Sequence, residues 1–209
     1  MTSASQGSTE IRAIDGSPLC PEALRMLDYL RTRSAELGPA GICERVRAAA
    51  LELDKAVDAV PESQIRERPV PGKWTIAEVV DHIAQTQIRA AEELRHLFAG
   101  RRPPGPPVYE ALRTGAAAWA PWPELVDGLR SANRELIALL ESAPAAEPAN
   151  PPKVLTILVV TRTLADGTTG PQIFPIDLGW KEYAILQRLH LLDHRTQVKK
   201  LREALAARC

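Results

Sequence analysis

The sequence predicts an all-α protein: an up-down four-helix bundle with an extra helix at the N-terminus and a small β-hairpin inserted before the last helix. Three observations support this. Apolar residues recur every three or four positions in four long segments, proline-rich and glycine-rich stretches separate these segments, and a single short β-branched run interrupts the helical pattern. Amphipathic helices of this kind bury their apolar faces against one another, with one long connection between them.

Length and charge exclude several classes of protein. The chain has 209 residues, with 26 basic and 26 acidic side chains, so its net charge is zero. It therefore has no overall attraction for nucleic acid or an anionic membrane, and we expect neither as a partner. No apolar run reaches the roughly 18 residues of a membrane span. The first ten residues show no secretory signal and the three cysteines form no CxxC pair, so we expect a reduced, cytoplasmic protein.

Two units are predicted along the chain. Residues 1–38 comprise a tail and a short helix, which begins at Pro21, where a missing backbone N–H costs nothing, and runs to about Leu37. Residues 39–209 comprise the four-helix bundle, whose first helix covers residues 41–60.

The second bundle helix has a well-defined start. Thr75 is followed three residues later by Glu78, the spacing of a capping box in which each side chain accepts a hydrogen bond from the other residue's backbone N–H. Val80 and Ile83 continue an apolar stripe to about residue 99, where Gly100 can end the helix.

The second half of the chain is interrupted twice. A loop rich in proline and glycine covers residues 101–121, and the third bundle helix follows at 123–142. The segment 144–178 is an insertion with a β-branched run at 154–164, a turn signal at Ala165-Asp166-Gly167 and a second run at 172–176. We interpret it as a strand or hairpin lying over the bundle. Because an isolated hairpin is only marginally stable, the apolar strand also permits a contact between the subunits of a homodimer.

The last helix, from Gly179 or Trp180 to about Ala207, contains the strongest chemical signal. His190 and His194 are four residues apart, which places their Cβ atoms about 6 Å apart on one face, a spacing that lets two imidazoles bind one ion. His82 is the best candidate for a third ligand. The alternative is that these are partly buried histidines that hydrogen-bond backbone or carboxylate groups. His96 lies about 21 Å further along the same helix as His82 and is expected to be an ordinary surface residue.

Two stretches resemble a known family. RPVPGKWTIAEVVDHIAQ at 68–85 is similar to the signature of the DinB/YfiT-like family, with a tryptophan, a threonine cap, an acidic residue and a histidine on the second helix. RLHLLDHRTQVKKL at 188–201 resembles the closing helix of that family. The resemblance implies a four-helix bundle that holds one divalent metal ion, most often zinc or nickel, on three histidines. These correspond here to His82, His190 and His194.

Gln197 is the one further residue to which we assign a catalytic role. It shares a helix face with His190 and His194 and could hydrogen-bond a metal-bound water or orient a ligand; the alternative is a partly exposed polar residue. Trp74 and Tyr183 are expected to be packing residues, although Tyr183, one heptad before His190, could reach the mouth of the pocket. Asp81 and Asp193 each precede a histidine and are expected to be solvated; the alternative is that they orient a metal ligand.

The resemblance leads to three functional hypotheses. The first is a metal-dependent thiol S-transferase that joins a low-molecular-weight thiol to a small electrophile, because characterised relatives include enzymes of that kind and a mycothiol-dependent isomerase. The second is a metal-dependent hydrolase that uses a metal-bound hydroxide. The third is a stress-associated metal-binding bundle without enzymatic activity. In the first, the segments 101–121 and 144–178 shape the pocket for the electrophile.

Overall fold

The computed structural model describes residues 11–13, 15–146, 148–164 and 166–208. This part of the chain is mostly helical, with five α-helices, two short 3-10 helices and one two-stranded sheet. The elements are α1 (Pro21–Glu36), α2 (Pro39–Asp58), η1 (Glu62–Gln64), α3 (Ile76–Phe98), η2 (Ala116–Ala118), α4 (Trp122–Glu141), β1 (Val154–Thr163), β2 (Thr169–Leu178) and α5 (Trp180–Ala206). The predicted helices are therefore confirmed to within two residues at their ends. The first half of the predicted N-terminal tail, Ala165 of the turn and Cys209 lie outside the described residues.

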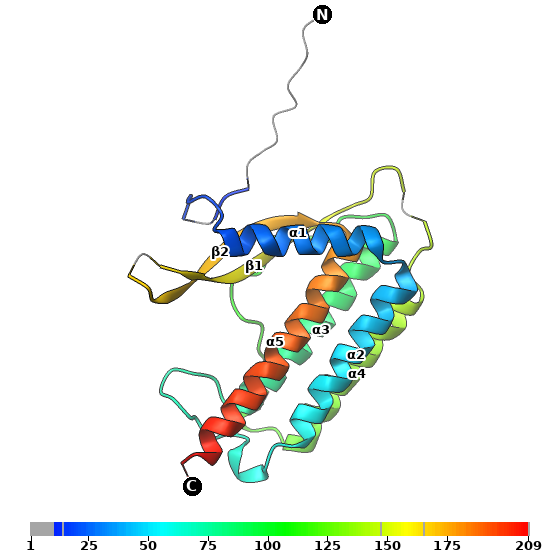
Figure 1. Ribbon diagram of the computed structural model, residues 1–209. Helices are drawn as coiled ribbons and strands as arrows, with labels where there is room; N and C mark the ends of the chain where they lie inside the picture. Colours follow the sequence, from blue (N-terminus) through cyan, green and yellow to red (C-terminus); the bar gives the residue numbers. More distant parts are fainter. Residues whose placement is uncertain (1–10, 14, 147, 165, 209) are drawn as a thin grey trace, which may run out of the picture.

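Four of the helices, α2 to α5, pack side by side as a bundle (Figure 1). Helix α2 contacts α4 and α5, and α3 contacts the same two helices, so α2 and α3 lie diagonally opposite. Helices α3 and α4 are parallel neighbours. Arg66, before α3, donates to the Ala117 carbonyl before α4 at 3.1 Å, and Arg95 near the end of α3 pairs with Glu135 near the end of α4.

Helices α2 and α5 are parallel as well. Glu52 of α2 lies 3.8 Å from Arg195 of α5, and Arg202 near the end of α5 donates to the Ala59 carbonyl just after α2 at 3.3 Å. The contacts between α3 and α5 run in opposite order along the two helices, so these two are antiparallel. The four bundle helices thus run up, down, down and up.

The expected up-down order is therefore not the order of this chain. Helices α3 and α4, consecutive in sequence, run in the same direction because the connection between them returns along the bundle. That connection comprises residues 99–121, which is 23 residues. A fully extended segment of this length reaches about 75 Å, whereas a 20-residue helix is only about 30 Å long. A long, proline-rich connection thus permits a parallel neighbour that a short loop would forbid.

Helix α3 begins as its sequence predicts. The side chain of Thr75 accepts a hydrogen bond from the Glu78 N–H at 3.1 Å, and the Glu78 carboxylate accepts one from the Thr75 N–H at 2.7 Å. The apolar stripe that includes Val80, Ile83 and Leu94 is fully buried in the core. The capping box fixes where the helix starts, and the stripe fixes which face turns inward, so the direction of the polar side chains is also set.

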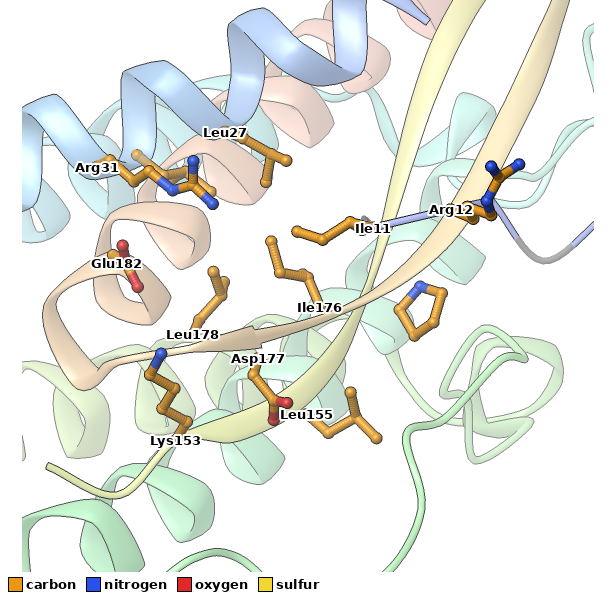
Figure 2. A pocket seen from close by; sticks show the side chains of 12 residues that line it. Ile11, Arg12, Leu27, Arg31, Lys153, Leu155, Ile176, Asp177, Leu178 and Glu182 are labelled. Atoms are coloured by element: carbon orange, nitrogen blue, oxygen red, sulfur yellow. The ribbon is translucent and has the colours of Figure 1, made fainter. Parts of the chain in front are cut away.

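The hairpin and α1 cover one end of the bundle (Figure 1). Strands β1 and β2 are antiparallel, in a register that pairs Val154 with Leu178. Helix α1 contacts both β1 and α5. A cavity of about 520 Å³ lies between α1, β2 and the start of α5, with Leu27, Ile176 and Leu178 among the side chains that line it (Figure 2). Among the described residues, no helix has the length and apolar character that crossing a membrane requires.

Candidate metal centre

Three histidines from two distant stretches of the chain meet between α3 and α5. His82 projects from the second turn of α3, and its Nε2 lies 3.2 Å from Nε2 of His190 on α5. Nε2 of His194, one turn further along α5, lies 2.9 Å from the same atom. One nitrogen from each ring falls within 4.8 Å of the other two. His96, near the far end of α3, is not part of this group, as expected.

The hydrogen bonds of these rings indicate which nitrogen carries a lone pair. Nδ1 of His82 donates to the Leu112 carbonyl at 3.0 Å, and Nδ1 of His194 donates to Gln197 Oε1 at 2.7 Å. In a neutral imidazole the other nitrogen is then an acceptor, so Nε2 of both rings presents a lone pair to His190. A single N–H on His190 Nε2 can satisfy only one of them well. A cation between the three rings would satisfy all three.

Burial keeps the three rings neutral. Desolvation lowers the pKa of His82, lowers the pKa of His194 to about 4, and holds the pKa of His190 well below its usual range. A charge on a neighbouring ring lowers the pKa of His190 and of His194 further. Neutral imidazole is the form that binds a metal ion, so the site requires no proton loss at neutral pH.

The spacing of the nitrogens fits a zinc-like ion. Zn–N bonds of about 2.0–2.1 Å in tetrahedral geometry separate two ligand nitrogens by about 3.3 Å. The observed separations from His190 to His82 and to His194, 3.2 and 2.9 Å, are close to that value. Nδ1 of His190 has no hydrogen-bond partner among the described residues, so this ring lacks the orienting contact that the other two have.

Asp81, expected to be solvated, is instead the anchor of a loop. Its side chain is 3% exposed and accepts hydrogen bonds from the Thr114 N–H at 3.0 Å, the Thr114 hydroxyl at 2.8 Å and the Gly115 N–H at 3.1 Å. Gly115 has a φ of +83°, a left-handed conformation that favours glycine. The anchored loop carries the Leu112 carbonyl that orients His82, so Asp81 supports that histidine indirectly.

Trp74 and Gln197 both contact the histidines. The Trp74 ring lies edge-on to His82 at 5.0 Å between centroids and nearly parallel to His194 at 6.3 Å, so it forms a wall of the site as well as packing at the helix start. Gln197, expected to face a metal-bound water or a ligand, directs its amide oxygen to the far nitrogen of His194. In this position it orients the ring.

A cavity of about 550 Å³ extends from the histidines along α3 and α5. Strand β1 and the loop around Leu112 also line it. Asp193 lies at the cavity with an exposed side chain, as expected. Tyr183, expected to be a packing residue, is buried and lines the cavity, where its hydroxyl donates to the Glu93 carboxylate. Burial raises the pKa of Tyr183 well above its usual value, so the hydroxyl stays protonated.

Several cavity residues are absent from the sequence-based prediction. They continue the helical spacing of the histidines, at steps of three or four positions from His82 on α3 and from His190 on α5. That spacing was a usable signal. The missed residues are Thr86, Arg89, Glu93 and Gln187.

Comparisons with known proteins bear on the family and the fold. Residues 44–166 match the sequence profile of the DinB superfamily. The chain is structurally similar to a mutant of the mycothiol-dependent maleylpyruvate isomerase, with a TM-score of 0.57 and 16% identity over 79% of this chain. It spans only 62% of the length of that isomerase.

A second similar structure is YfiT from Bacillus subtilis, described as a probable metal-dependent hydrolase with an unusual four-helix bundle topology. Its TM-score is 0.51, with 16% identity over 80% of this chain and 87% of that protein. At these identities the two structures show a shared fold. No curated protein sequence matches the chain significantly.

Proposed function

The chain belongs to the DinB superfamily, and from this premise we propose that it is a metal-dependent thiol S-transferase acting on small electrophiles. His82, His190 and His194 hold one divalent ion, with zinc or nickel expected from the nitrogen donors. The observation that carries the proposal is the convergence of three neutral imidazoles at one end of a cavity of about 550 Å³. Bound by these three neutral imidazoles, the ion would supply a Lewis acid that lowers the pKa of a thiol or of water.

The chain's own residues position and shield the reacting groups. The Leu112 carbonyl and Gln197 hold the rings of His82 and His194, and Trp74 packs against both rings. Strand β1 gives the cavity an apolar wall for the electrophile. The sulfur forms a bond to the electrophilic carbon, the leaving group departs with its electron pair, and the thiol proton passes to solvent.

Most carboxylates near the histidines are already occupied by hydrogen bonds or ion pairs, which favours a thiol over water as the nucleophile. Attack by water is assisted by a general base, whereas an ionised thiol needs none. Asp81 accepts three hydrogen bonds, and Glu78 pairs with Arg68 and Arg113. Glu93 is occupied by an arginine and a tyrosine. The isomerase of similar fold is mycothiol-dependent, which supports the same preference.

Hydrolysis is the second candidate, and Asp193 is the observation that favours it. This exposed carboxylate lines the cavity, next to His194 in sequence, and forms no ion pair with another described residue. It is therefore free to accept a proton from water. The hydrolase and the transferase would share the three histidines and differ in their need for Asp193.

One substrate that accepts both nucleophiles separates the two functions. The zinc-loaded protein is given p-nitrophenyl acetate in ¹⁸O-labelled water, with and without a small thiol. We expect metal-dependent formation of the S-acetyl thioester, and activity in Asp193→Asn close to that of the unchanged protein. Labelled acetate formed without thiol, together with loss of activity in Asp193→Asn, would establish hydrolysis instead. Stoichiometric zinc without either product would leave the non-enzymatic metal-binding bundle.

Loss of metal from a single-site variant tests the metal centre separately from turnover. His194→Ala removes one of three ligands, so we expect elemental analysis to find far less than one zinc per chain. His96→Ala is the matched control, because His96 lies on the same helix as His82 but outside the cluster. Equal zinc content in both variants would contradict the assignment.

A homodimer is also proposed, with β1 at the interface. Val159 on β1 is 62% exposed despite its apolar side chain. Strand β2 contains Pro171 and Pro175, which cannot donate backbone hydrogen bonds to an added strand, whereas β1 contains no proline. Light scattering measures the oligomeric state of the unchanged protein and of Val159→Lys. We expect the unchanged protein to be a dimer and the variant to be a monomer. A monomeric unchanged protein would refute the proposal.

A further inference from the structure

Two facing rows of side chains bound the cavity beside the histidines. The row on α3 consists of His82, Thr86, Arg89 and Glu93, and the row on α5 consists of Tyr183, Gln187, His190 and His194. The rows meet at both ends, because His82 approaches His190 at one end and the Tyr183 hydroxyl donates to Glu93 at the other. The cavity is thus a slot with a histidine end and a carboxylate end.

Between these ends, Gln187 has a polar atom without a partner. Its side chain is 4% exposed and lines the cavity, and none of the described residues hydrogen-bonds its Oε1. Its neighbours across the slot are engaged: the Thr86 hydroxyl donates to the His82 carbonyl at 2.9 Å, and Arg89 donates to Glu93 at 2.8 Å. A buried amide without a partner costs free energy, and a bound molecule that hydrogen-bonds it removes that cost.

The position of Gln187 limits the length of the group that can reach it. It lies three residues before His190 on α5, which is about 4.5 Å along the helix axis. A molecule whose sulfur lies at the histidine end therefore meets Gln187 with an atom two or three bonds further along.

The charge of the slot limits the chemistry of that group. Arg89 and Glu93 form an ion pair, so together they add no net charge, and Gln187 is neutral. An ionised carboxylate has no hydrogen to donate to the Gln187 oxygen, and an ammonium group would lose its hydration beside an ion pair that is already formed. The Gln187 oxygen needs a donor, and a hydroxyl supplies one without carrying a charge.

We infer that Gln187 determines specificity in the proposed transfer by hydrogen-bonding a hydroxyl on the thiol substrate, two or three carbons from the sulfur. The inference rests on the proposed function, since it assumes that the sulfur lies at the three histidines. It adds the substrate class: small thiols with a neutral hydroxylated chain.

Binding of three small thiols to the zinc-loaded full chain, measured by calorimetry without an electrophile, tests the inference. The thiols are 1-thioglycerol, 1-propanethiol and 3-mercaptopropionate, which share a three-carbon chain and differ in its polar groups. We expect 1-thioglycerol to bind about tenfold more tightly than 1-propanethiol, with Gln187→Leu abolishing the difference.

Gln87→Leu is the matched control. Gln87 on α3 is also fully buried with both side-chain polar atoms unpartnered among the described residues, but it does not line the cavity. Both variants remove a buried, unpaired amide, so both should fold, and circular dichroism and zinc content verify this. Only Gln187→Leu should lose the preference for 1-thioglycerol.

Several results would overturn the inference. These are equal or undetectable binding of 1-thioglycerol and 1-propanethiol, tighter binding of 3-mercaptopropionate, or loss of the preference in Gln87→Leu as well. The proposed function is judged separately by thioester formation from p-nitrophenyl acetate. Equal turnover with every thiol would leave the transferase and refute the role of Gln187. Conversely, if Gln187 determines which thiol binds but no thioester forms, the transferase is refuted and the role of Gln187 in binding remains.

Discussion

His194 connects the stability of the metal-free protein to pH. Its pKa is about 4 in the folded protein, against about 6.5 for a histidine in an unfolded chain. Between these values the unfolded state binds more protons than the folded state, so stability falls as the pH falls. The pKa values of His190 and His82 shift in the same direction. The expected loss is about 1.4 kcal/mol per pH unit for each histidine that stays neutral in the folded state.

Urea unfolding of the chelated protein between about pH 7.5 and pH 5 measures this dependence, in a range above the titration of ordinary carboxylates. His194→Asn should reduce the slope by about one histidine's contribution. A free energy of unfolding that does not change over this range would mean that the three rings are not held neutral by burial.

At the residue scale, spacing along the sequence predicted that His190 and His194 share one face, because their four-residue step depends only on the geometry of one helix. That His82 meets them from α3 was suggested by the family resemblance. Their binding of a metal stays a prediction. Glu93 and Tyr183 could not be paired in the same way, since their contact depends on how α3 and α5 face each other. Asp81 was also misjudged, because the loop that buries it returns from more than thirty residues later in the chain.

At the scale of elements, the loop that Asp81 anchors should control the site. Asp81→Asn can keep an oxygen against the N–H groups of Thr114 and Gly115, but that acceptor is neutral instead of charged. Its N–H₂ group then faces the Thr114 hydroxyl, which can no longer donate to residue 81 and already accepts from the Ala116 N–H. The expected cost is about 1–3 kcal/mol of stability. Release of the loop also frees His82 from the Leu112 carbonyl, so we expect zinc affinity to fall by about tenfold or more.

Hydrogen exchange across residues 112–116 and a competitive chelator titration measure the two effects. Asp28→Asn on α1 is the control, because this carboxylate is exposed and far from the loop in sequence. Unchanged exchange and unchanged zinc affinity in Asp81→Asn would show that the loop holds its position without the carboxylate.

The elements themselves were the most predictable part of the structure. The capping box of Thr75 and Glu78 and the β-branched run that forms β1 are local signals, and both appear where the sequence places them. Local signals do not determine the course of the long loop at 99–121. That loop lines the cavity around Leu112, and its position follows from contacts with α3 that are distant in sequence.

At the scale of the whole molecule, the order of the helices was the main error. Amphipathic periodicity shows that each helix buries one face, and this holds equally for parallel and antiparallel neighbours. Only the length of the connection from α3 to α4 hinted that the chain could return before α4 begins. The ion pair of Arg95 with Glu135 forms only when α3 and α4 are parallel. Such pairs are a consequence of the helix order, so they could not be used to predict it.

Metal binding should stabilise the entire bundle, because its ligands come from α3 and α5, which are distant in sequence but in contact. An ion that binds only the folded state, present at about 100 times its dissociation constant, adds about 2.7 kcal/mol. For a chain of this size, that corresponds to a rise in Tm of about 5–10 °C. Scanning calorimetry of the chelated protein, titrated with zinc, measures the shift. His190→Ala removes a ligand and should show almost none, whereas a shift of the same size in this variant would mean that zinc acts elsewhere on the molecule.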